Sequence, residues 1–156
     1  MSSFGPPIFV GGCRSAFCRA FKGSLLEKRP DDLLVDVLTA QADRNPFWGQ
    51  QNPEDVILGC AYPEGEQGYN LARTVALGSG RNVPGCTVNR LCASSLEAVA
   101  MAAGRIKAGW GHCYLVGGVE SMSRIPRRGS NFSPSARIES RCPAAYIPNG
   151  ETAELV

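Results

Sequence analysis

The stretch VNRLCASSLEAVAMAAGRIKA, residues 88–108, predicts a helix that begins shortly after a cysteine, Cys92. Apolar residues recur along one side of residues 94–108 at the spacing of a helix face. Ala98 and Ala102 belong to an opposite side that is mostly apolar too. A helix that is apolar nearly all round is buried on every side. We therefore expect this helix to lie between two sheets. The chain supplies strands for only one of them, so the second layer is missing or comes from another chain.

Outward from this helix, the chain alternates short apolar runs with helical patterns. This alternation is typical of an α/β domain whose parallel strands are joined by helical crossovers. The expected strands are Ile8–Gly12, Asp55–Ala61, Cys86–Arg90 and Cys113–Val119. Two further helices are expected: one that starts just after Pro30, with Asp31 or Asp32 as its cap, and stops at Asn45-Pro46, and one over Asn70–Leu77.

Cys92 falls between the strand that ends near Arg90 and the first turn of the long helix. Reactive groups favour the carboxyl ends of strands in such sheets. Unpaired N–H groups at a helix start favour an anion, so a thiol there ionises more readily, and the thiolate is the nucleophile. The same N–H groups could stabilise an oxyanion on an attacked carbonyl. Cysteine also often serves only as a small buried residue, and position alone leaves that interpretation open for Cys92.

Composition narrows the classes of function. The chain has 156 residues, a net charge of +2, 44% hydrophobic and 19% charged residues, which indicates one domain with much of its surface covered by other layers or chains. Basic residues are dispersed, so we expect no nucleic-acid binding. The one local cluster, Arg124, Arg127 and Arg128, is interpreted as a solvated loop. No apolar run is long enough to span a membrane, and the first residues lack the pattern of a signal peptide.

Seven cysteines and one histidine give no metal or disulfide pattern. The odd number of cysteines and the lack of a CxxC pair favour reduced thiols in an intracellular, cytoplasmic protein. His112 has no ligand partner at metal spacing, so we interpret it as structural and expect no metal site. A thiol nucleophile also needs a base, and His112 has no evident route to Cys92.

Five segments resemble the motifs of thiolases, in order and with fitting spacing. Val88–Ala98 closely resembles the nucleophile motif of that family, and Leu115–Ser123 is similar to its fourth-strand motif. The other three are Arg14–Phe17, similar to the first-strand turn; Pro63–Gly68 with Asn70, Ala72 and Arg73, similar to the second-strand turn of degradative 3-ketoacyl-CoA thiolases; and Asn149–Glu154, similar to the start of the loop domain. The resemblance runs from about residue 8 to residue 156. Ser95 stands where many relatives have glycine, although serine also occurs there in degradative members.

The resemblance implies a thiolase-like layered α/β fold. Residues 1–123 would be the N-terminal domain without its last strand, and residues 124–156 the truncated start of the loop domain. The N-terminal half would have a mixed, mostly parallel sheet and a buried helix that carries the nucleophile, Cys92. Subunits would pair through the strand Cys86–Arg90.

The implied reaction is acyl transfer between coenzyme A thioesters. Cys92 would take an acyl group from a 3-ketoacyl-CoA and release acetyl-CoA, and coenzyme A would then accept the acyl group; synthesis reverses these steps. Passing through a thioester splits one difficult transfer into two easier ones. Coenzyme A is then a substrate, and no cofactor is bound.

The resemblance also implies that much of the active site comes from elsewhere. In thiolases the activating histidine, a second acid/base cysteine and a water-holding asparagine belong to the C-terminal half, and most coenzyme A contacts belong to the loop domain. We therefore expect acyl-CoA substrates, a homo-oligomer or a complementary C-terminal thiolase chain as partner, and no catalysis by this chain alone. The alternative is an inactive fragment that acts only as an interaction module or is a truncation product. A third and weaker interpretation is another condensing enzyme of the same superfamily, such as a ketoacyl synthase. The segment Glu64–Gly68 favours a thiolase instead.

Overall fold

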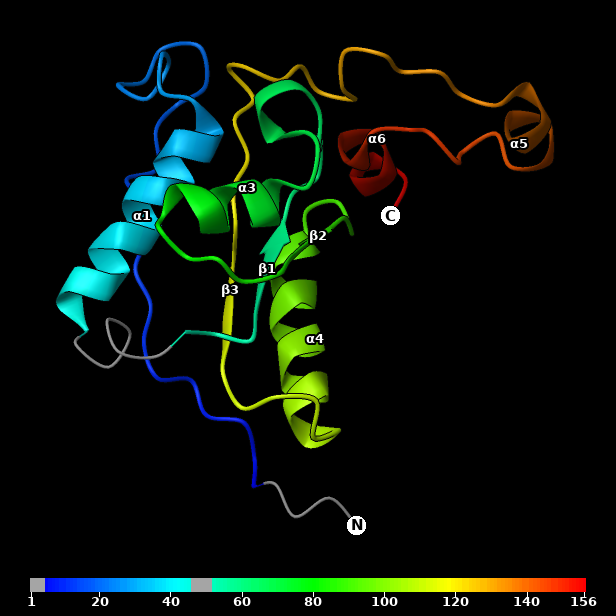
Figure 1. Cartoon of the computed structure of the whole chain (residues 1–156). Helices are drawn as coiled ribbons and strands as arrows, with labels where there is room; N and C mark the ends of the chain where they lie inside the picture. The colour runs from blue at the N-terminus through cyan, green and yellow to red at the C-terminus, as the bar shows by residue number, and fades with distance from the viewer. Residues whose placement is uncertain (1–4, 46–51) are drawn as a thin grey trace.

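A computed structural model describes residues 5–45 and 52–156, which form an α/β arrangement around one parallel sheet (Figure 1). The strands are β1 (Asp55–Gly59), β2 (Gly85–Val88) and β3 (Tyr114–Gly118), in the spatial order β2–β1–β3. Helices α1 (Pro30–Arg44) and α3 (Leu71–Gly78) pack on one face, and α4 (Ser94–Lys107) packs on the other. The expected α/β class is confirmed, and these elements lie within two residues of their predicted bounds. Over the described residues the sheet is wholly parallel rather than mixed.

The central strand β1 carries the core of the molecule. Val56 and Leu58 are fully buried against the helices α1 and α3, whereas Ile57 points the other way, against Ala98 and Ala102 of α4. Successive side chains of a strand point to opposite faces of the sheet. A continuous apolar run is therefore what a strand with both faces covered requires.

Helix α1 begins one residue earlier than its expected cap. Arg29 is the N-cap and makes no side-chain capping bond, and Pro30 takes the first helical position, where its missing N–H costs nothing. The prediction that Asp31 or Asp32 caps this helix is wrong, because both lie inside its first turn. Their negative charge still favours that helix end, and Asp31 forms an ion pair of 2.7 Å with Arg29.

The apolar run Ile8–Gly12 forms no strand, so that prediction is wrong. Ile8 and Phe9 are 80% and 76% exposed, and the segment pairs with none of the three strands. It is held at α1 instead, where the thiol of Cys13 donates a 3.1 Å hydrogen bond to the carbonyl oxygen of Val37. A cavity of about 550 Å³ is lined by this segment, α1, α4 and β3. A strand needs a partner backbone at about 4.8 Å, and the cavity leaves this segment without one.

Helix α4 is buried only on the side that faces the sheet. Ser94, Ala98 and Ala102 are buried there, whereas Leu96 on the outer side is 72% exposed. The described residues contain no second sheet to cover that outer side. The expectation that this helix is buried on both faces therefore holds only for the face against the sheet. The outer face is the one that a second sheet, expected to be missing from this chain, would cover.

Residues 124–156 lie mostly outside this core. Their helices, α5 (Ala136–Arg141) and α6 (Asn149–Glu154), contain no buried residue. In Figure 1 the orange α5 lies far from the sheet, whereas the red α6 returns toward it. Two of the three arginines interpreted as a loop cluster have separate contacts: Arg124 pairs with Glu66 of the short 3-10 helix η1 (Gly65–Gln67), and the Arg128 guanidinium lies over the ring of Phe132.

Candidate functional site

Cys92 lies in the turn that leads from β2 into α4, at the carboxyl-terminal edge of the sheet. Its side chain is exposed, its thiol is free, and it directly precedes Ala93, the N-cap of α4. The cysteine is therefore found where the sequence places it, between a strand end and a helix start. The thiol is open to solvent beside the positive end of a helix dipole.

The turn before Cys92 holds one residue in the left-handed conformation. Leu91 has a φ of 47°, which costs a non-glycine residue about 1–2 kcal/mol. The Asn89 side-chain oxygen accepts a 2.8 Å bond from the Leu91 N–H, and the Ser94 hydroxyl donates a 2.5 Å bond to the Leu91 carbonyl. The same hydroxyl accepts a 2.8 Å bond from the N–H of Arg90. Leu91 is thus held on both sides, and this fixes the direction in which the chain presents Cys92.

Two glycines let the start of α4 approach the strand ends closely. Gly59 ends β1 and Gly118 ends β3. A Cβ atom at Gly59 would collide with the backbone of Ser94 and Ser95, and one at Gly118 would collide with the Ser95 hydroxyl. Glycine is therefore needed at both positions for this close packing. The first turn of α4, with Cys92 just before it, sits directly against the carboxyl end of the sheet.

A chain of hydrogen bonds connects the loops after β1 and β3 to the Cys92 turn. Gln67 is fully buried, and its amide donates a 2.6 Å bond to the Glu120 carboxylate. The other oxygen of Glu120 accepts a 2.7 Å bond from the N–H of Ala61. The carbonyl of Ala61 in turn accepts a 2.9 Å bond from the side-chain amide of Asn89. A fully satisfied polar network of this kind rigidifies the segments it joins.

The start of α4 also offers free hydrogen-bond donors. Glu97 is the first residue whose N–H bonds back to the N-cap, at 2.9 Å to the carbonyl of Ala93. In the described part of the chain, no hydrogen bond uses the N–H of Ser95 or Leu96. Such orphan amides at a helix start attract an anion. The nearest charges on this segment, Arg90 and Glu97, are paired with each other at 3.0 Å.

Asn149 contacts the sulfur of Cys92, and the sequence did not predict this. Its side-chain nitrogen lies 3.7 Å from the sulfur, in the geometry of a donated hydrogen bond. Asn149 is the first residue of α6 and lies 57 positions further along the chain. Its only sequence signal was membership of the 149–154 motif. Local pattern says nothing about which distant segment it meets.

The single histidine is remote from this thiol. His112 follows the C-terminal end of α4, whereas Cys92 precedes its N-terminal end. A helix of 14 residues is about 20 Å long, so the imidazole does not reach the sulfur. The backbone N–H of His112 donates a 3.0 Å bond to Glu54. No side chain of the described residues is thus placed as a histidine base for Cys92.

The thiol of Cys60 is buried, unlike that of Cys92, and is unreactive at neutral pH. Burial, assisted by the negative charge of Glu120, raises the pKa of the Cys60 thiol to about 11, so it stays protonated at neutral pH. No group of three or more His, Cys, Asp or Glu side chains in the described residues could hold a metal ion. Across residues 5–45 and 52–156, no helix has both the length and the apolar character needed to cross a bilayer.

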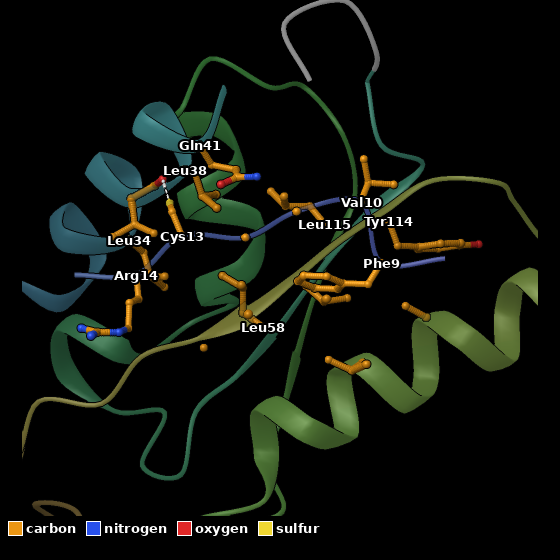
Figure 2. Close-up of a pocket in the computed structure, with 18 of the residues that line it drawn as sticks. Phe9, Val10, Cys13, Arg14, Leu34, Leu38, Gln41, Leu58, Tyr114 and Leu115 are labelled. Carbon is orange, nitrogen blue, oxygen red and sulfur yellow. Dashed lines mark hydrogen bonds between the residues drawn. The ribbon is translucent and has the colours of Figure 1, made fainter. Parts of the chain in front are cut away.

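The cavity beside β3 is separate from the thiol. Figure 2 shows Leu34, Leu38 and Gln41 from α1 on one side of it and Tyr114 and Leu115 from β3 on another. Its lining is mainly apolar and does not include Cys92. This cavity and the Cys92 thiol therefore lie at different places in the fold.

Comparison with known proteins gives a consistent result. Residues 8–148 match the family model described as "Thiolase, N-terminal domain". A 3-ketoacyl-CoA thiolase of Bacillus subtilis is 39% identical over 151 residues, which is 96% of this chain and 38% of that protein. A beta-ketoadipyl-CoA thiolase of Acinetobacter baylyi is 48% identical over 119 residues, 75% of this chain and 29% of that protein. A 3-oxoadipyl-CoA/3-oxo-5,6-dehydrosuberyl-CoA thiolase of Escherichia coli is 44% identical over 124 residues, 76% of this chain and 31% of that protein. The chain thus spans roughly a third of the length of the curated relatives it matches.

Proposed function

This chain belongs to the thiolase family through its N-terminal domain, and from that premise we propose that Cys92 carries an acyl group as a thioester during acyl transfer between coenzyme A thioesters. The observation that carries the proposal is the exposed Cys92 thiol, held by a fixed turn at the start of α4. The free N–H groups of Ser95 and Leu96 in the same helix turn support it, because such donors stabilise negative charge.

In the degradative direction, the Cys92 thiolate attacks the ketone carbon of a 3-ketoacyl-CoA. The bond between the second and third carbons breaks, and its electron pair leaves as the enolate of acetyl-CoA, which takes up a proton. The acyl group remains on the sulfur as a thioester. The thiolate of coenzyme A then attacks that thioester, giving a shortened acyl-CoA and restoring Cys92. Coenzyme A is a substrate throughout, and the proposal includes no bound cofactor.

The rest of the active site comes, in this proposal, from a C-terminal thiolase half, either in a longer form of the polypeptide or in a partner chain. No histidine of the described residues reaches Cys92, which supports a base supplied from outside this segment. Residues 1–123 are then the N-terminal domain and residues 124–156 the start of the loop domain. The assembly is proposed to work in the cytoplasm, in keeping with the seven free thiols.

The cavity beside β3 fits the same division of the fold. β3 pairs with β1 along one edge, and no described strand pairs with its other edge. The last strand of the N-terminal sheet, which follows the loop domain in thiolases, would occupy the apolar cavity of about 550 Å³. The exposed run Ile8–Phe9 would then gain a neighbour and be covered.

The test uses the chain with the complementary C-terminal half, or the longer polypeptide that contains both, and acetoacetyl-CoA. Thiolysis and an added acetyl group on the tryptic peptide Leu91–Arg105, which contains only one cysteine, are expected. Cys92→Ser abolishes both, whereas Cys142→Ser, which changes the other exposed thiol, leaves both in place. Absence of a thioester on Cys92 in the complete assembly would refute the proposal.

A second candidate, a catalytically inactive interaction module, is favoured by one observation. Leu96 and Ala100, one helical turn apart, are exposed apolar residues on the outer side of α4, and exposed apolar surface promotes association. Sedimentation distinguishes the two functions when combined with the thioester assay. A stable assembly that never acylates Cys92 identifies the module, and an assembly that acylates it identifies the enzyme.

A further inference from the structure

Asn149 and Cys92 form a contact that the proposed reaction does not yet use. The side-chain nitrogen of Asn149 lies 3.7 Å from the Cys92 sulfur, and the contact has hydrogen-bond geometry with nitrogen as the donor. Both side chains are exposed. The contact therefore lies on the open side of the thiol, where an incoming substrate would approach.

The segment that carries Asn149 is held in place by contacts of its own. The Arg128 guanidinium donates a 3.1 Å bond to the carbonyl of Tyr146, and the Tyr146 ring meets the ring of Phe132 edge-on at 5.9 Å. Pro148 is the N-cap of α6, and its carbonyl accepts bonds from the Thr152 N–H at 3.1 Å and from the Thr152 hydroxyl at 3.4 Å. The helix start that presents Asn149 to the sulfur is thus tied, through Tyr146, to Arg128 and Phe132 of the preceding loop.

In this pair the Asn149 side-chain amide is the hydrogen-bond donor and the Cys92 sulfur is the acceptor. The carboxamide of asparagine has two N–H donors and neither loses nor takes up a proton as an acid or base near neutral pH. A thiolate accepts a hydrogen bond more strongly than a thiol does, because bonds to a charged partner are the stronger ones. The Asn149 amide therefore favours the ionised sulfur over the neutral one and cannot serve as its base.

We infer that Asn149 is a second catalytic residue of this chain, which donates a hydrogen bond to the reacting sulfur of Cys92 and so stabilises its thiolate. The inference rests on the proposed function for its catalytic meaning, although the hydrogen bond itself is measurable without turnover. The charged groups on the elements around the sulfur are Arg90 and Glu97, which pair with each other, and Glu151 and Glu154 of α6. These four charges are unchanged in the variants compared below.

The experiment measures the rate at which iodoacetamide alkylates Cys92 as a function of pH in the 156-residue chain. The tryptic peptide Leu91–Arg105 reports Cys92, and the exposed thiol of Cys142 is the reference in the same sample. Asn149→Leu removes the donor while nearly preserving the side-chain shape. Its matched control, Thr152→Val, removes a hydroxyl from the same helix that contacts Pro148 and not the sulfur. All residues of α6 are exposed, so neither change touches the core.

In Asn149→Leu the midpoint of the Cys92 alkylation profile moves up by about half a pH unit, a fraction of what a bond to a charged group can supply. Cys142 and the Thr152→Val variant show no such shift. Asn149→Asp, which puts a negative charge at the same place, raises the midpoint further. An unchanged midpoint in Asn149→Leu, or an equal shift in Thr152→Val, would overturn the inference.

The two proposals fail in different ways. If the midpoint shifts but the complete assembly never acylates Cys92, the hydrogen bond stands and the proposed acyl transfer is wrong. If Cys92 is acylated but its alkylation midpoint is the same in Asn149→Leu as in the wild type, the acyl transfer stands and the role inferred for Asn149 is wrong.

Discussion

The buried amide of Gln67 donates a 2.6 Å hydrogen bond to the carboxylate of Glu120, and this contact joins the loop after β1 to the loop after β3. The Glu120 carboxylate also accepts a hydrogen bond from the N–H of Ala61. The carbonyl of Ala61 accepts one from the side-chain amide of Asn89, three residues before Cys92. The turn that presents the thiol is therefore supported by side chains from three separate segments.

Replacing Gln67 with leucine tests how much this network stabilises the fold. The change removes the hydrogen-bond partner of the Ser121 N–H and of one Glu120 carboxylate oxygen, whereas the carbonyl of Tyr62 keeps the N–H of Glu64. Each buried polar group left unpaired costs about 1–3 kcal/mol, so we expect the free energy of unfolding to fall by about 2–3 kcal/mol. Urea denaturation followed by circular dichroism measures it. Ser140→Ala, which removes an exposed hydroxyl in α5, should change it by less than about 0.5 kcal/mol.

Because the backbone of Leu91 is left-handed, we expect glycine to be tolerated better than valine at this position. Leu91→Gly relieves the backbone strain at φ 47° and should leave the free energy of unfolding within about 1 kcal/mol of the wild type, because glycine's greater freedom in the unfolded chain offsets the relief. Leu91→Val places a β-branched residue in a conformation it resists, and should destabilise the fold by about 1–2 kcal/mol. Thermal unfolding of both variants distinguishes them. A valine variant as stable as the glycine variant would show that the turn is not held in this conformation.

Gly118 and Gly104 should respond in opposite ways to alanine. At Gly118 the new Cβ meets the Ser95 hydroxyl and the carbonyl of Gly59, so Gly118→Ala should destabilise the fold by about 1–3 kcal/mol. It should also change the alkylation rate of Cys92, because the start of α4 is pushed off the sheet. Gly104 lies in α4 with open space around it, so Gly104→Ala should stabilise the helix by about 0.5–1 kcal/mol. Equal effects at the two sites would contradict the close seating of α4.

Cys60 should make the stability fall at alkaline pH. Its folded pKa of about 11 lies above the ordinary value of 9.0, because burial opposes ionisation. The contribution of the protonated Cys60 thiol to the free energy of unfolding is therefore fully present below pH 9. It is lost as pH rises from 9 toward 11, because the thiol ionises in the unfolded chain before it ionises in the folded one. The free energy of unfolding should drop over this range by more in the wild type than in Cys60→Ala, whose curve reports the remaining titrating groups. Parallel curves would show that Cys60 ionises equally well in both states.

The elements that could be predicted from sequence are those whose signal is local. The helix over 94–107 follows from its apolar spacing, and the strand 55–59 from its continuous apolar run. The run Ile8–Gly12 carries the same strand signal and yet forms no strand. Its conformation depends on a pairing partner, which the cavity beside β3 does not contain, and not on its own residues.

The sequence by itself determined the class of the fold, the family and the position of Cys92 between a strand and a helix, because spacing and motif order are properties of neighbouring residues. Only the tertiary structure decided that Gln67, Glu120 and Asn89 brace the cysteine's turn and that Asn149 reaches its sulfur. Those contacts join segments separated by 28 to 57 positions. Which distant side chains meet is set by how helices and strands pack, and the local pattern of any one segment does not contain that information.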